Sequence, residues 1–62
     1  MRKQEFIHKM AYGDLTDEQV RKEYNRHYRA KGETIYKFTT DVCLASCATA
    51  ARDAEKRIKR IA

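Results

Sequence analysis

The chain has 62 residues, no proline and two glycines, which is enough for one small domain and predicts helices with two breaks. It contains no run of about 18 apolar residues for a membrane span, and its start lacks the apolar segment of a signal peptide. We therefore expect a cytoplasmic protein, of phage or mobile-element type given its brevity. Its net charge of +5 favours polyanionic partners, nucleic acid before anionic lipid.

The first predicted helix covers residues 2–12. Phe6, Ile7 and Met10 recur at the spacing that places side chains on one side of a helix. Gly13 predicts its end, because glycine adopts the left-handed conformation of a helix C-terminus at little cost. The start of the chain is therefore expected to be one amphipathic helix.

The second predicted helix covers residues 16–31 and has a well-marked start. Thr16 and Gln19 have the spacing of a capping box, in which each side chain binds the other residue's backbone amide. Leu15 and Val20 have the spacing of the hydrophobic staple that accompanies such a start. The helix is expected to continue until the second glycine.

The last predicted helix begins at about residue 34 or residue 40 and continues to residue 61. The structure of residues 33–41 is left open between an extended segment and a helix, because β-branched and aromatic residues dominate there. Apolar and small residues repeat at intervals of three and four, as in a heptad seam. The seam, predicted to pack helices or form a dimer, consists of Leu44, Cys47, Ala51, Ala54, Ile58 and Ile61.

These elements predict an all-α protein of two or three helices, arranged as a small hairpin or bundle with a long C-terminal helix. We expect that helix to pack against a stripe formed by Val20, Tyr24 and His27 or Tyr28. Large apolar residues are few for a chain of this size, so the core is thin. A homodimer that uses unfilled parts of the seam would complete it.

Part of the sequence resembles a known family. Residues 11–26 are similar to the later part of a J-domain, a co-chaperone module in which Ala-Tyr ends a helix and Leu-Ser-Asp and Arg-x-x-Tyr-Asp follow. The matching motifs are Ala11-Tyr12, Leu15-Thr16-Asp17 and Arg21-x-x-Tyr24-Asn25. The family's His-Pro-Asp loop is missing, so the resemblance does not imply its stimulation of a chaperone ATPase.

No set of residues predicts a metal, a cofactor or catalysis. Cys43 and Cys47, with His8 and His27, have the composition of a zinc site, but the histidines are 19 residues apart instead of the usual four to six. We expect both thiols to be small buried side chains, with Cys47 in the seam. The prediction is a protein without catalytic residues.

The leading functional expectation is a non-enzymatic regulatory protein that binds a protein partner. Four tyrosines are many for this length, and tyrosine is enriched at interfaces. The absence of a catalytic set in the sequence points the same way.

The alternative is a regulator that binds DNA or RNA through the basic side of the second helix and the basic end of the last one. Segments 16–32 and 52–62 carry net charges of +2 and +3. The first two helices have the spacing of a helix-turn-helix unit, although Asp17 and Glu18 stand where its recognition helix faces DNA. The expected surface for either partner comprises Arg21, Lys22, Asn25, Arg26, Tyr28, Arg29, Lys56 and Arg60.

Overall fold

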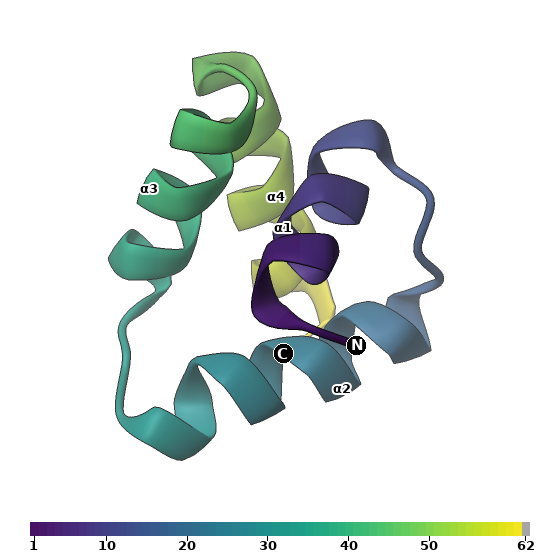
Figure 1. Ribbon diagram of the computed structural model, residues 1–62, viewed down its shortest axis with the longest axis vertical. Helices are drawn as coiled ribbons and strands as arrows, with labels where there is room; N and C mark the ends of the chain where they lie inside the picture. The colour runs from purple at the N-terminus through teal and green to yellow at the C-terminus, as the bar shows by residue number, and fades with distance from the viewer. Residues whose placement is uncertain (62) are drawn as a thin grey trace.

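The computed structural model describes residues 1–61 and confirms an all-α fold. Three helices lie side by side and one crosses an end of the group (Figure 1). The prediction of two or three helices is wrong, because the described residues form four α-helices and a short 3-10 turn. These elements are α1 (Lys3–Tyr12), α2 (Asp17–His27), η1 (Arg29–Lys31), α3 (Ile35–Ala45) and α4 (Ala48–Ile61).

The first helix agrees with its prediction to within one residue. Gly13 follows α1 with a φ of 73°, in the left-handed region. Its amide donates to the carbonyl oxygens of Lys9 and Met10, which would otherwise lack partners at the helix end. Glycine is needed at this position because a Cβ atom is strained in that conformation.

The predicted start of α2 is also confirmed. The Thr16 hydroxyl oxygen accepts from the Gln19 amide at 3.2 Å, and the Gln19 side-chain oxygen accepts from the Thr16 amide at 3.0 Å. Leu15 and Val20 are both buried, as the staple requires. Leu15 and Thr16, which also belong to the J-domain resemblance, thus have a local role in starting this helix.

The second helix is shorter than predicted. α2 ends at His27 instead of continuing to residue 31, and Tyr28 leaves helical geometry with a φ of −123°. This departure accompanies the complete burial of the Tyr28 ring, whose hydroxyl donates to the Asp41 carboxylate at 2.8 Å. The chain then makes the turn η1 and ends it at Gly32.

The expected long C-terminal helix is broken at Ser46. Of the two predicted starts, the earlier is right: the Thr34 hydroxyl accepts from the Lys37 amide and caps α3. With 3.6 residues per turn, an unbroken helix would place Phe38 about half a turn away from Ile58. The break folds α4 back along α3, so that both of these residues face the same core.

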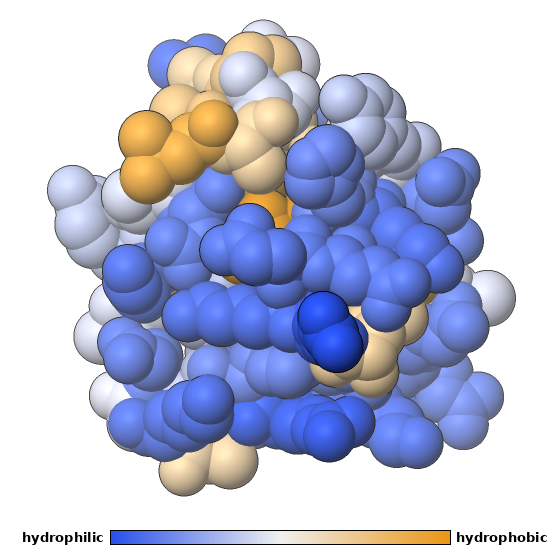
Figure 2. Space-filling view, viewed as in Figure 1, coloured by the Kyte–Doolittle hydropathy of each residue, from blue (hydrophilic) through white to orange (hydrophobic). Residues whose placement is uncertain are grey.

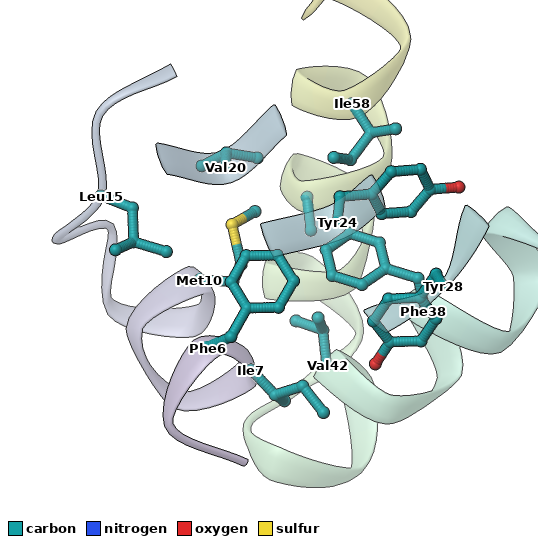
Figure 3. Packing of buried hydrophobic residues seen from close by; sticks show 11 residues of the cluster. Phe6, Ile7, Met10, Leu15, Val20, Tyr24, Tyr28, Phe38, Val42 and Ile58 are labelled. Carbon is teal, nitrogen blue, oxygen red and sulfur yellow. The ribbon is translucent and has the colours of Figure 1, made fainter. Parts of the chain in front are cut away.

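The core is an aromatic cluster centred on Phe38 (Figure 3). Its ring lies 5.7 Å from that of Phe6, 5.2 Å from that of Tyr24 and 5.1 Å from that of Tyr28, measured between centroids. The two tyrosines meet it edge-on, a favoured arrangement for aromatic pairs. One side chain of α3 thus joins α1, α2 and the residue that follows α2.

The helix break divides the predicted seam. Leu44 is 81% exposed and Cys47 is also exposed, so neither packs helices together within one chain, and their part in a dimer seam stays a prediction. The remaining residues do pack: Ala51, Ala54 and Ile58 are buried and Ile61 is half-buried. One chain encloses apolar residues from all four helices, and a homodimer stays a prediction.

The break at Ser46 can be tested with two substitutions on α3. Val42 is fully buried, so Val42→Ala is expected to lower the free energy of unfolding by roughly 2 kcal/mol. The exposed Leu44 should tolerate Leu44→Ala with a loss of less than about 0.5 kcal/mol. Urea unfolding measures both, and an equal loss in the two variants would contradict the broken helix.

Candidate functional site

The outward side of α2 is basic. Its inward side is formed by Val20, Tyr24 and His27, together with Glu23, all of which are buried. The other side of the helix and the turn after it face solvent, and Asn25 is half-buried. The exposed basic residues on this stretch are Arg21, Lys22, Arg26, Arg29 and Lys31.

The C-terminal end of α4 lies against the start of α2. The Asp17 carboxylate accepts from the Arg57 side chain at 3.1 Å and from the Arg60 side chain at 3.3 Å. Arg57 also donates to the carbonyl oxygen of Leu15. Both arginines are on the last turns of α4, so they hold that end of the helix beside α2.

This packing joins the two basic segments of the sequence. Segments 16–32 and 52–62 together account for the whole net charge of +5, and the charges of all other residues cancel. Among the sequence-predicted residues, Arg60 lies beside the start of α2 through its ion pair with Asp17, and Arg21, Lys22, Arg26 and Arg29 are exposed on α2 and the turn after it. We call this region, with Lys59, the basic end; Lys56 is exposed on the opposite side of α4 from the core.

A hollow of about 510 Å³ opens beside the basic end. It is formed by residues from α2, the η1 turn, the linker to α3, α3 itself and α4. Sequence reasoning missed Glu33, Ile35 and Lys59 as site residues, since no local motif links positions from separate elements. Its lining comprises Tyr24, Arg29, Glu33, Ile35, Ile58 and Lys59.

The four tyrosines do not gather on one exposed binding surface. Tyr28 is fully buried, so its assignment to a partner surface is wrong. Burial and the adjacent Asp41 carboxylate raise the pKa of Tyr28 far above its ordinary value. The exposed tyrosines are Tyr12 and Tyr36, which lie on α1 and α3.

A buried polar cluster connects the N-terminus to α2. The N-terminal amine of Met1 donates to the Glu23 carboxylate at 2.9 Å. The His27 Nε2 atom lies 3.2 Å from that carboxylate and 2.9 Å from the Met1 carbonyl oxygen. Because these polar groups satisfy one another within the fold, the cluster fixes the start of the chain against α2.

The two cysteines occupy the turn between α3 and α4. Cys47 is exposed, and Cys43 is only half-buried, so the prediction of buried thiols is wrong. The nearby backbone amide of Ala50, the Ser46 hydroxyl, which donates to the Cys47 sulfur at 3.9 Å, and the Thr49 amide lower the pKa of the Cys47 thiol.

The same turn forms an apolar region at the end of the molecule opposite α2. Residues 42–51 contain no charged side chain, in a chain of which 37% of residues are charged. Figure 2 shows an orange and tan area at the top, where α3 ends, above a mostly blue surface. We call the exposed residues Leu44, Cys47 and Ala48 the apolar corner.

Residues 1–61 contain neither a cluster of metal-ligating side chains nor a membrane-spanning helix. No three histidine, cysteine or acidic side chains there lie close enough together to hold a metal ion. None of the helices in this part of the chain is both long and apolar enough to cross a membrane.

Comparisons of the chain with protein-family models, with curated proteins and with solved structures find no match.

The buried Glu23 carboxylate predicts that the stability of the fold depends on pH. The hydrogen bond from the N-terminal amine, opposed by burial, lowers the pKa of Glu23 below its ordinary value. The carboxylate therefore adds stability at neutral pH, and this contribution is lost as the pH falls below about 4, through the folded-state pKa. Thermal unfolding at a series of pH values should show a smaller acid-induced drop in Tm for Glu23→Gln than for the unchanged protein.

The matched control for this experiment is Glu5→Gln. Glu5 is an exposed acid of α1, so its variant should follow the pH dependence of the unchanged protein. Parallel pH curves for Glu23→Gln and the unchanged protein would contradict the stabilising role of the Glu23 carboxylate.

Proposed function

We propose that this chain is a small non-enzymatic regulatory protein that binds nucleic acid through the basic end. The observation that supports this most is the joining of segments 16–32 and 52–62, which carry the whole net charge, at one end of the fold. Lysine and arginine side chains bind phosphates and release the counterions condensed on nucleic acid. This ranks nucleic acid above the protein partner favoured by the sequence.

The chemistry of α2 favours phosphate contacts over the reading of base pairs. A recognition helix places base-contacting residues near its start, where α2 has Asp17 and Glu18. Asp17 is bound to two arginines of α4, and the basic residues of α2 begin one turn later. Binding of this kind positions a protein on nucleic acid without selecting a duplex sequence.

The first test is a titration with duplex and single-stranded DNA at two salt concentrations. Binding through phosphates must weaken steeply as salt increases, because counterion release drives it. The absence of any binding at low salt would contradict the proposed function.

A pair of double variants locates the surface. The double variant Lys22→Ala, Arg26→Ala removes two exposed basic side chains from the basic end. It should reduce the slope of log K against log salt by about 1 for each side chain removed. Lys9→Ala with Lys37→Ala removes the same charge from α1 and α3 and should leave that slope nearly unchanged. Equal slopes in the two double variants would contradict the placement of the site.

A protein partner is the second candidate, and the apolar corner favours it. Leu44 exposes 81% of its surface in a ten-residue uncharged segment, and an apolar side chain at that exposure gains from being covered by a partner. A second copy of the chain is the simplest partner, which keeps the predicted homodimer as part of this candidate. The cytoplasmic location and phage or mobile-element origin expected from the sequence also remain proposals.

Sedimentation equilibrium at tens of micromolar tests the homodimer. If the apolar corner joins two copies, the measured mass should be twice that of the chain and Leu44→Asp should reduce it to one chain. A mass of one chain for the unchanged protein would exclude this partner.

A further inference from the structure

The hollow beside the basic end combines three kinds of surface. Ile58 is buried and Ile35 half-buried, and together they give it an apolar floor. Arg29 and Lys59 are exposed basic residues on separate elements at its edge. Glu33 is its one acidic residue. A flat apolar group with a phosphate on either side fits this hollow. The group would lie on the apolar floor, and the phosphates would meet the two basic side chains.

Tyr24 adds a polar edge to the floor. Its ring is stacked on Tyr28 and touches Phe38 edge-on, so its faces belong to the core. Figure 3 shows the ring beside Ile58, with its hydroxyl pointing away from the aromatic cluster. The hydroxyl can donate or accept a hydrogen bond at the wall of the hollow.

The acidic residue distinguishes this hollow from a simple phosphate site. A carboxylate repels phosphate but accepts hydrogen bonds from amino groups, and Asp and Glu accept from the cytosine amino group in nucleic-acid complexes. The backbone holds Glu33 in place, because its amide donates to the Tyr28 carbonyl oxygen at 2.8 Å and the α3 cap follows directly. The turn therefore fixes the backbone of Glu33 at the wall of the hollow, which Arg29 and Lys59 also line.

We infer that the hollow binds one unstacked nucleobase that carries an exocyclic amino group, while Arg29 and Lys59 bind the neighbouring phosphates. Glu33 accepts from the amino group, and Ile35 and Ile58 cover the base. Cytosine, adenine and guanine carry this group, whereas thymine offers a single N3–H donor flanked by two carbonyl oxygens that repel a carboxylate, and is disfavoured. Bases are free to leave the stack only in single strands, so the site selects single-stranded nucleic acid. This inference rests on the proposed function.

The experiment compares oligo(dC), oligo(dT) and a duplex of equal length by fluorescence anisotropy at neutral pH and one low salt concentration. The unchanged protein should bind oligo(dC) about tenfold more tightly than oligo(dT), as expected for one base-specific contact. It should also bind oligo(dC) more tightly than the duplex.

Glu33→Gln tests the assigned acceptor. A neutral amide both donates and accepts, so it fits the thymine carbonyls as well, and the preference for oligo(dC) should fall to about twofold or less. Asp14→Asn is the matched control, since it removes one exposed acid from the loop between α1 and α2 and should keep the preference.

The outcomes separate the inference from the proposed function. Salt-sensitive binding with equal affinity for oligo(dC) and oligo(dT), or with a preference that survives Glu33→Gln, would overturn the nucleobase site and leave phosphate binding in place. No binding to any of the three DNAs would overturn both. Loss of the preference in Glu33→Gln but not in Asp14→Asn would support the site.

Discussion

The aromatic contacts around Phe38 hold the arrangement on which the other features depend. This ring, fully buried on α3, meets Phe6 of α1, Tyr24 of α2 and Tyr28. Because α2 and the following residue are held at this point, α2 lies across the end of the other helices and turns its opposite side to solvent (Figure 1). The orientation of the basic residues is thus a consequence of aromatic packing.

The features predicted correctly from sequence are those determined within a few residues. The Thr16–Gln19 capping box and the Gly13 helix end depend on local backbone chemistry, and both are present. The break at Ser46 has no glycine or proline to mark it. Its signal lies in the spacing, because Phe38 and Ile58 would lie on opposite sides of one continuous helix.

The candidate site could be predicted only in part from the sequence, because most of it depends on contacts between distant residues. Composition identifies two basic segments, but only packing joins them, through Asp17 and the arginines of α4. Tyr28 was misplaced because tyrosine suits both a wet interface and a core, and sequence pattern alone does not separate these environments. Glu33 and Lys59 enter the site through the fold, with no motif to mark them.

The central claim is that nucleic acid binds at the end of the fold that α2 crosses. Backbone amide NMR spectra recorded while a short single-stranded DNA is added test it most directly. The account predicts that resonances of Lys22, Arg26 and Glu33 move with increasing DNA, while those of Leu44 and Cys47, at the opposite end, stay in place. Shifts confined to the apolar corner, or no shifts at low salt, would contradict it.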